Sequence, residues 1–164
     1  MVAHAIRVHG DPVLRQATFE VTEFDAALTR LADEMLETMY KAPGVGLAAN
    51  QIGIQKRVFV WDVGDGPGVA VNPVLSDHAG EWSYDEGCLS VPGLFWPIVR
   101  PGQVHLRAQD LDGQRYELDG NEILARVFLH EVDHLHGKLL IDRLDAGTKR
   151  EALAELRNRD LELR

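Results

Sequence analysis

The sequence has only one cysteine and no long apolar run. Cys88 stands alone among 164 residues, so no disulfide can form within the chain, as is usual in a reducing compartment. No stretch approaches the roughly 18 apolar residues that a membrane-spanning helix needs. The first ten residues, MVAHAIRVHG, lack the apolar core of a signal peptide. We therefore expect a cytoplasmic protein with no membrane partner.

Positive charge is also scarce. Seventeen Lys and Arg stand against 26 Asp and Glu, which gives a formal net charge of -9. This balance disfavours broad electrostatic attachment to nucleic acid or anionic lipid, so we expect no specific DNA binding. The 15 Gly and 7 Pro are scattered, with no linker-like segment, and the length suits one compact unit. We predict a single domain over residues 1–164 that acts on a small molecule or a peptide.

Hydrophobic periodicity predicts an N-terminal helix followed by strands. Thr22 together with Asp25 offers a capping-box-like start for the helix, which is expected to end near Ala42-Pro43. Its apolar side recurs at helical spacing as Leu28, Leu31, Met35 and Met39. Branched and aromatic residues predict strands over 57–63 and 69–75. Alternating residues on both sides of Asp112-Gly113 predict a hairpin.

Helical spacing returns in the last third of the chain. The residues from Asn121 to Gly137 predict one helix, with Gly137 as its stop, and a last helix is expected from about Thr148. This order of elements indicates an α+β fold. We expect antiparallel strands packed around the helix that ends at Gly137, with an N-terminal helix and a C-terminal helix beside them.

The segment LHEVDHLHG contains two histidines four positions apart, with a glutamate beside the first. Residues four apart on a helix lie one above the other, so His130 and His134 can reach one metal ion. Glu131 is offset by about 100° and is close enough to act as a general base without being a ligand. His136 points elsewhere and is expected at the surface. An ordinary helix with exposed His and Glu is disfavoured, because the neighbouring residues are apolar and buried histidines need partners.

The identity of a third ligand separates the classes of metalloenzyme. A metzincin would have histidine where this chain has Leu140. A thermolysin-like peptidase would use a downstream glutamate, and Glu151 or Glu155 could serve, although both lie in a mixed-charge segment typical of a solvated face. Cys88 in DEGCLSVPG is the remaining candidate, since a thiolate is a strong ligand, but the residues alone leave a buried structural cysteine equally open. A purely structural ion is disfavoured because it would need four protein ligands.

The segment GVGLAA, residues 44–49, also fits a dinucleotide-binding fingerprint, with Asp62 near the expected separation. That fingerprint must follow a strand and open a helix, whereas this segment follows a predicted helix and Pro43. Too little chain lies between Ala49 and Arg57 for a crossover helix. We expect instead a loop where another backbone can come close.

Three segments together resemble the signature motifs of the peptide deformylase family. They are GVGLAANQ (44–51), EGCLS (86–90) and HEVDHLHG (130–137), in the family's order. The flanking segments METMYKAPGVGLAANQIG and VNPVL are similar as well, so the resemblance covers most of the chain. It implies a metal-dependent hydrolase that removes the N-formyl group from the initiator methionine of new polypeptides and releases formate. N-formyl-methionyl nascent peptides would be its partners, and a transient contact with the ribosome is compatible with the resemblance.

The resemblance also implies roles for particular residues. The metal ligands would be Cys88, His130 and His134. One divalent ion is implied, with Fe(II) expected in the cell and Zn(II), Ni(II) or Co(II) able to occupy the site. Glu131 would take a proton from the attacking water and pass it to the departing amine. The side-chain amide of Gln51 and the backbone N–H of Leu89 would stabilise the oxyanion.

The substrate peptide is expected to bind in extended form against the backbones of Val45 and Gly46. The pocket for the methionine side chain would be lined by Val45, Tyr84, Ile123, Val127 and His130. Arg126 stands in this wall where an apolar residue is common, and we expect its stem to fold along the rim.

Three further expectations concern the surroundings of the motifs. Arg100 is expected to pair with Glu86 and brace the cysteine segment. Leu129 stands where many relatives have glutamine, which removes a hydrogen bond behind the ligands. The segment Gly93–Trp96 is expected to form a loop whose exposed aromatic side chains, Trp96 among them, contact the peptide beyond methionine.

Overall fold

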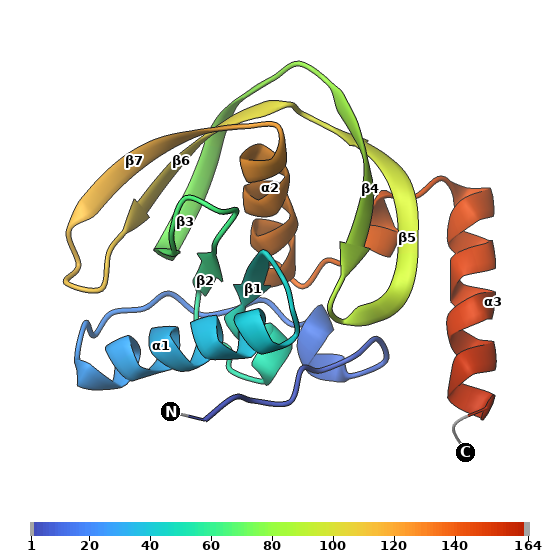
Figure 1. Cartoon of the computed structure of the whole chain (residues 1–164), viewed down its shortest axis with the longest axis horizontal. Helices are drawn as coiled ribbons and strands as arrows, with labels where there is room; N and C mark the ends of the chain where they lie inside the picture. The colour runs from blue at the N-terminus through green and yellow to red at the C-terminus, as the bar shows by residue number, and fades with distance from the viewer. Residues whose placement is uncertain (1, 163–164) are drawn as a thin grey trace.

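The computed structural model describes residues 2–162, so the ends of the predicted domain, Met1, Leu163 and Arg164, lie outside the described residues. Within the described chain there are three α-helices, α1 (Ala26–Lys41), α2 (Ile123–Leu135) and α3 (Ala146–Glu162), and two antiparallel sheets (Figure 1). The predicted α+β fold class is confirmed. No helix in residues 2–162 has the length and apolar character needed to cross a membrane.

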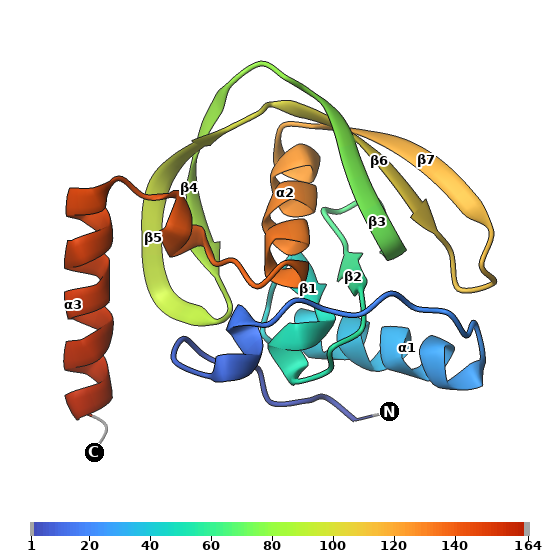
Figure 2. The same ribbon diagram turned by 180° about the vertical axis from the view of Figure 1, so that it is seen from behind.

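The larger sheet has five strands in the order β1-β2-β3-β6-β7. They are β1 (Gly46–Ala48), β2 (Val58–Trp61), β3 (Gly68–Ala79), β6 (Gln103–Gln109) and β7 (Arg115–Asn121). The smaller sheet pairs β4 (Trp82–Cys88) with β5 (Val91–Arg100). Seen from the front and from behind, α2 stands between the two sheets, α1 lies beneath β1 and β2, and α3 stands outside β5 (Figures 1 and 2).

Helix α1 ends where the sequence predicts, and of the two residues in the expected capping box it is Asp25, not Thr22, that caps its start. Asp25 is its N-cap, with a side chain that accepts a hydrogen bond from Leu28 N at 3.0 Å, and Ala42 is its C-cap. A capping carboxylate satisfies one of the free N–H groups of the first turn. The predicted apolar residues are buried against β1 and β2, where Leu28, Met35 and Met39 are fully inaccessible to solvent.

Helix α2 is anchored to the five-stranded sheet by aromatic packing. Phe128 contacts Phe59 and Trp61 of β2, with ring centroids 5.9 and 5.1 Å away. Aromatic pairs at these separations contribute beyond their buried area. At the other end of α2, Asn50 Nδ2 donates to His134 O at 2.5 Å, and Gly137 adopts a positive φ of 77° that ends the helix. The histidine-bearing face of α2 is thus held at both ends.

The short 3-10 helix η2 (Ala49–Ile52) follows β1 directly, so GVGLAA opens no long helix. The N-terminal segment then joins two motifs that are distant in sequence. Arg7 N donates to Gln51 O at 2.7 Å and His9 N donates to Ser90 O at 2.8 Å. The backbone of residues 7–9 therefore fixes the first motif against the second.

The segment Gly93–Trp96 is not the loop that the sequence suggested, because it forms part of β5. The strand is irregular there: Cys88 pairs with Val91, but Gly87 pairs with Phe95, so the intervening residues of β5 bulge out. Pro92 and Gly93 in this bulge obscured the strand pattern, since both residues weaken a strand prediction.

The predicted hairpin is confirmed as β6 and β7, and it carries an exposed cross-strand ion cluster. His105 Nδ1 lies 2.6 Å from Asp119 Oδ1, and His105 Nε2 lies 3.0 Å from Glu117 Oε1. Hydrogen bonds to Glu117 and then Asp119 raise the pKa of His105 above its usual value. Because the folded-state pKa is raised, protonated His105 and its two carboxylate partners stabilise the fold at pH values below the unfolded-state pKa. This stabilisation is lost as pH rises through the folded-state pKa.

We therefore expect NMR titration to place the pKa of His105 above the usual histidine value of 6.5. The double variant Glu117→Gln/Asp119→Asn should bring the titration midpoint back towards that value, because both hydrogen-bonding carboxylates are gone. Equal midpoints in the parent and the double variant would contradict this assignment.

Candidate metal centre

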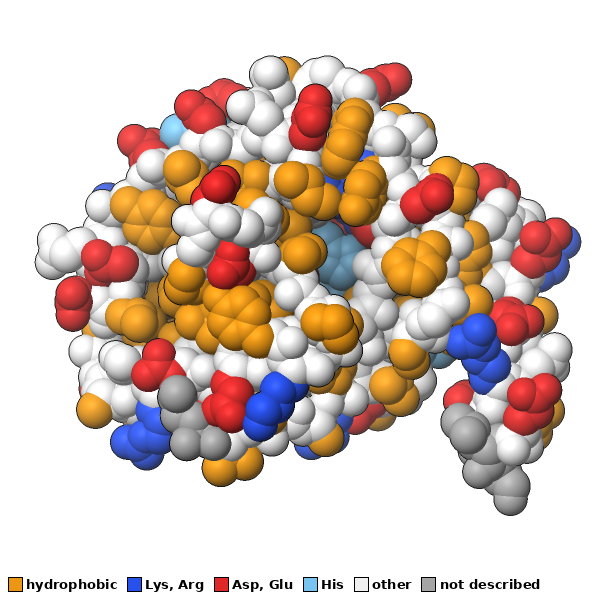
Figure 3. Space-filling model, in the orientation of Figure 1, with side chains coloured by type: hydrophobic (Ala, Val, Ile, Leu, Met, Phe, Trp, Pro, Cys, Tyr) orange, Lys and Arg blue, Asp and Glu red, His pale blue; other side chains and the backbone are white. Residues whose placement is uncertain are grey.

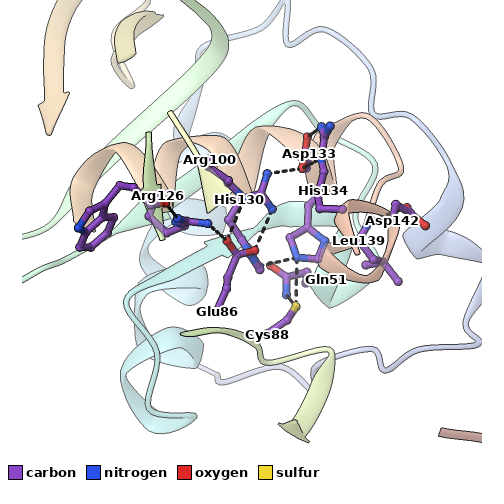
Figure 4. Close-up of polar contacts among 12 residues, drawn as sticks. Gln51, Glu86, Cys88, Arg100, Arg126, His130, Asp133, His134, Leu139 and Asp142 are labelled. Atoms are coloured by element: carbon purple, nitrogen blue, oxygen red, sulfur yellow. Dashed lines mark hydrogen bonds and ion pairs between the residues drawn. The ribbon is translucent and has the colours of Figure 1, made fainter. Parts of the chain in front are cut away.

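The three signature segments meet at one place, although they lie far apart in sequence. Cys88 comes from the end of β4, and His130 and His134 come from one face of α2 (Figure 4). Cys88 Sγ lies 3.3 Å from His134 Nε2, which lies 3.1 Å from His130 Nε2. The three ligand atoms are all within 4.8 Å of one another. The structure thus brings the three predicted ligands together.

The donor set fits a single divalent ion. Ligand bonds of about 2.0–2.1 Å to nitrogen and 2.3 Å to sulfur place tetrahedral donors roughly 3.3–3.6 Å apart, close to the separations seen. Two imidazole nitrogens and a thiol sulfur facing one another have lone pairs that repel unless a cation lies between them. No fourth His, Cys, Asp or Glu joins the cluster within residues 2–162, so a position remains open for a reactant.

Glu86 orients the first histidine. His130 Nδ1 lies 2.8 Å from Glu86 Oε2, while Arg100 forms two hydrogen bonds to the same carboxylate at 2.9 and 2.8 Å. Burial alone would raise the pKa of Glu86, but the hydrogen bonds from His130 and Arg100 outweigh burial and hold that pKa far below its usual value. Glu86 is therefore a carboxylate that accepts the Nδ1 proton, which leaves Nε2 free to face the metal position. The predicted pairing of Arg100 with Glu86 is confirmed.

The sequence predicted that the stem of Arg126 folds along the rim of the pocket. In the structure the side chain is buried instead. Its Nη1 donates to Glu86 Oε1 at 2.8 Å and its Nη2 donates to Trp82 O at 2.6 Å. The guanidinium also lies 5.7 Å from the ring of Trp82 and 5.9 Å from that of Tyr84. The sequence could not show this, because the acceptors come from β4, about forty residues away.

A second buried carboxylate extends this network along α2. Asp133 accepts from Arg100 Nη1 at 2.8 Å and from both Nε and Nη2 of Arg143, in the 3-10 helix η3 (Leu140–Arg143). Burial by itself would raise the pKa of Asp133. The hydrogen bonds from Arg143 and Arg100 outweigh burial, so the pKa of Asp133 lies below its usual value. Sequence reasoning overlooked Asp133, although its place between the two histidines of the motif was a usable signal. Through Arg100, β5 is tied to the helix that carries both histidines.

Glu131 lies beside the cluster without a hydrogen-bond partner for its buried Oε2. Burial raises the pKa of Glu131 to about 7, although the neighbouring His130 opposes the shift. A cation at the neighbouring position would lower that pKa again. A buried carboxylate with an unpaired oxygen suits a group that must exchange a proton with a reactant.

Gln51, in η2, and Leu89, in the turn between β4 and β5, both line the cavity beside the cluster. Gln51 Nε2 lies 3.8 Å from Cys88 Sγ, and its Oε1 accepts from Ala48 N at 2.9 Å. The side chain of Leu89 lies over Gly44, where a methyl group would come within 2.7 Å of it. A side chain at position 44 would therefore have to push the Leu89 side chain aside.

The cluster opens into a cavity of about 640 Å³ between β1, β4 and α2. Figure 3 shows this hollow, with histidine at its floor and hydrophobic side chains around it. Every predicted substrate-binding residue lines it: Val45, Gly46, Tyr84, Ile123, Arg126 and Val127. Phe95, two-thirds exposed, also lines the cavity, whereas Trp96 is partly buried and packs with Leu140, Ala152 and Leu156. Of the two aromatic side chains in this segment, Phe95 lines the cavity and Trp96 does not.

The remaining candidates lie away from the cluster. Glu151 and Glu155 are exposed on α3, and neither joins the group of close ligand atoms. His136 is exposed, as predicted. Leu129 is partly buried and packs against the cluster that contains Phe59 and Phe128. Its apolar side chain contributes to packing in this position.

Comparison with known proteins agrees with this arrangement. A family model described as polypeptide deformylase matches residues 3–150. A peptide deformylase of Agathobacter rectalis is 50% identical over 147 residues, which is 90% of this chain and 93% of that protein. A solved peptide deformylase from Legionella pneumophila is 38% identical, with a TM-score of 0.92 over 99% of both chains. One from Ehrlichia chaffeensis in complex with actinonin is 32% identical, with a TM-score of 0.92 over 97% of this chain and 98% of that one.

The family match spans all three motifs, and the relatives are similar in both sequence and three-dimensional structure. Both halves of the site, the hairpin of β4 and β5 and helix α2, lie within the matched residues. The chain therefore belongs to the peptide deformylase family, the hydrolases that remove the N-formyl group from nascent polypeptides.

Proposed function

We propose that Cys88, His130 and His134 hold one divalent metal ion at which this chain hydrolyses the formyl amide of N-formyl-methionyl peptides. The observation that carries the proposal is the convergence of three ligand atoms within 4.8 Å of one another at the floor of a cavity lined by apolar residues. A divalent ion bound there would polarise the formyl oxygen and favour deprotonation of water. Thiolate and imidazole donors suit zinc as well as iron, so Fe(II) as the cellular metal rests on resemblance to the family.

The proton transfers are assigned to Glu131. Its unpaired buried oxygen can accept the proton of the attacking water and then deliver that proton to the amine as the C–N bond breaks. Among the described residues, Glu131 and Glu86 are the two carboxylates that line the cavity next to the ligands. Glu131 has no arginine partner, so the proposal gives it both roles. Glu86, by contrast, is already paired with Arg100 and Arg126.

Negative charge on the formyl oxygen would be stabilised by the Nε2 amide of Gln51 and the backbone N–H of Leu89. The peptide would lie in extended form along β1, an edge strand, against the backbones of Val45 and Gly46. Its methionine side chain would enter the cavity between Tyr84, Ile123 and Val127. Arg126 closes this wall with its charge neutralised by Glu86, so the wall remains compatible with an apolar side chain.

We further propose that residues 1–164 work as one catalytic domain in the cytoplasm, where nascent formylated chains are present. A transient contact with the ribosome would bring these chains to the cavity. The net charge of -9 means that any such contact would rely on a local surface and not on overall attraction to RNA.

The test of the proposed function is formate release from formyl-Met-Ala-Ser by the Fe(II)-loaded protein under anaerobic conditions. The matched control is acetyl-Met-Ala-Ser, which has the same peptide and a bulkier acyl group. Formate from the first peptide and no acetate from the second would support a deformylase. Failure to release formate from a fully metal-loaded protein would contradict the proposal.

Gly46 gives a further prediction about the proposed base. A methyl group at this position would lie 2.7 Å from Glu131 Oε1 and 3.0 Å from Val127 Cγ1. Gly46→Ala should displace the carboxylate, and a misplacement of about 1 Å can cost about 100-fold in rate. We expect a drop of that order in kcat/KM, measured by formate release, with the metal content unchanged.

Gly102→Ala is the matched control, because the nearest atom to a new methyl group would be Trp82 Cβ at an ordinary 3.5 Å. It should keep the parent kcat/KM. Parent activity in Gly46→Ala would show that the close packing of this glycine on Glu131 has no role in catalysis.

A further inference from the structure

The buried residue Ser90 contacts Gln51, Cys88 and His9 through three different atoms. Its side-chain Oγ accepts a hydrogen bond from Gln51 Nε2 at 3.1 Å. Its backbone N–H points to Cys88 Sγ at 3.4 Å, and its backbone O accepts from His9 N at 2.8 Å. Substitution of the side chain can therefore separate the contact with Gln51 from the contacts that shape the cysteine loop.

The amide of Gln51 can take only one orientation in this setting. Its Oε1 faces Ala48 N at 2.9 Å, and a backbone N–H can only donate, so the oxygen must lie on that side. The NH₂ group then faces Ser90 Oγ and Cys88 Sγ. Gln51 and Ser90 are 1% and 0% exposed, so no bulk water competes for these groups.

One of the two Nε2 protons is taken by Ser90, which directs the other to the side of Cys88 Sγ, 3.8 Å away, and Cys88 and Gln51 both line the cavity. We propose that Ser90 is a positioning residue, whose hydroxyl holds the Gln51 amide in the orientation needed to stabilise the oxyanion. This inference rests on the role of Gln51 in the proposed function. Donors of this kind accelerate a reaction because they are already oriented before charge develops. Without Ser90 Oγ, rotation about the terminal torsion of Gln51 is restrained from the Ala48 side only.

The proposal predicts a particular pattern in a double-mutant cycle of Ser90→Ala and Gln51→Ala, assayed for formate release from formyl-Met-Ala-Ser. Removal of an oxyanion donor should lower kcat in Gln51→Ala by about 100-fold. Ser90→Ala keeps the donor but loosens it, so kcat should fall by about 10-fold with KM nearly unchanged, as for the loss of one neutral hydrogen bond. In the double variant, kcat should equal that of Gln51→Ala, because Ser90 would have nothing left to position.

The second readout is independent of activity. In the metal-free and the Zn(II)-loaded parent, NMR should show two well-separated Nε2 proton resonances for Gln51. In Ser90→Ala these should move towards the shifts of a solvated amide. The metal content of Ser90→Ala should equal that of the parent, since the backbone N–H to Cys88 is retained.

The outcomes separate this inference from the function on which it rests. Independent losses that multiply in the double variant, or unchanged Gln51 amide resonances in Ser90→Ala, would overturn the positioning role and leave the deformylase assignment intact. Parent-level kcat in Gln51→Ala would instead refute the oxyanion role of Gln51, and the role of Ser90 with it. A tenfold loss in Ser90→Ala that disappears in the Gln51→Ala background, together with shifted amide resonances, would establish the proposal.

Discussion

Replacing Cys88 by alanine is expected to abolish stable metal binding. The thiolate is one of three ligand atoms. Its loss leaves two imidazoles, which is fewer than the three protein ligands that hold the ion in a catalytic metal site. Changing a residue that only supports a metal ligand commonly costs about 10- to 100-fold in affinity, so losing a ligand itself should cost more than about 100-fold. Metal content after desalting, measured by elemental analysis, should fall from one ion per chain to near zero, and deformylation should be lost with it.

Two control variants make this result specific. His136→Ala removes an exposed histidine two positions beyond a proposed ligand and should retain the ion. Glu151→Ala should also retain it, whereas a thermolysin-like site would lose its metal through that change or through Glu155→Ala. Full metal retention in Cys88→Ala would contradict the proposed ligand set and return Cys88 to the role of a structural cysteine.

Replacing Glu131 by glutamine is expected to abolish turnover while the ion stays bound. Glutamine keeps the shape of the side chain but cannot take a proton from water or return one to the amine. General acid–base catalysis contributes about 10²- to 10⁴-fold, so kcat should fall within that range. Because Glu131 is buried without a partner for Oε2, its replacement by a neutral side chain should leave the midpoint of urea-induced unfolding equal to or above that of the parent.

The interpretation of Glu131→Gln depends on measuring metal content and activity on the same preparation. Loss of activity together with loss of the ion would place Glu131 among the groups that hold the metal. Activity within a factor of two of the parent, with the ion present, would exclude it as the proton carrier.

Local sequence patterns were sufficient for the parts of the fold that depend on neighbouring residues. The cap at Asp25, the buried side of α1, the β6–β7 hairpin and the ligand-bearing face of α2 each follow from spacing or turn chemistry within about fifteen residues. The same applies to the pair of histidines, because one helix sets their geometry. Resemblance to known motifs was needed to add Cys88, which lies on another element.

The features that the sequence did not predict depend on contacts between distant segments. Arg126 lies on α2, yet its partners are Glu86 and the carbonyl of Trp82 on β4, so no local pattern distinguishes it from a residue at the rim. Strand β5 escaped prediction because a bulge with Pro92 and Gly93 interrupts its alternation. The same bulge obscured which aromatic side chain of this segment lines the cavity, since Phe95 does and Trp96 does not.

The central claim is that one sulfur and two imidazole nitrogens hold the catalytic ion. X-ray absorption at the iron edge of the Fe(II)-loaded parent, beside Cys88→Ala reconstituted with excess Fe(II), tests it most directly. We predict a sulfur ligand and imidazole scattering in the parent, and no sulfur in any iron bound to the variant. An inner shell made only of nitrogen and oxygen in the active parent enzyme would contradict the account.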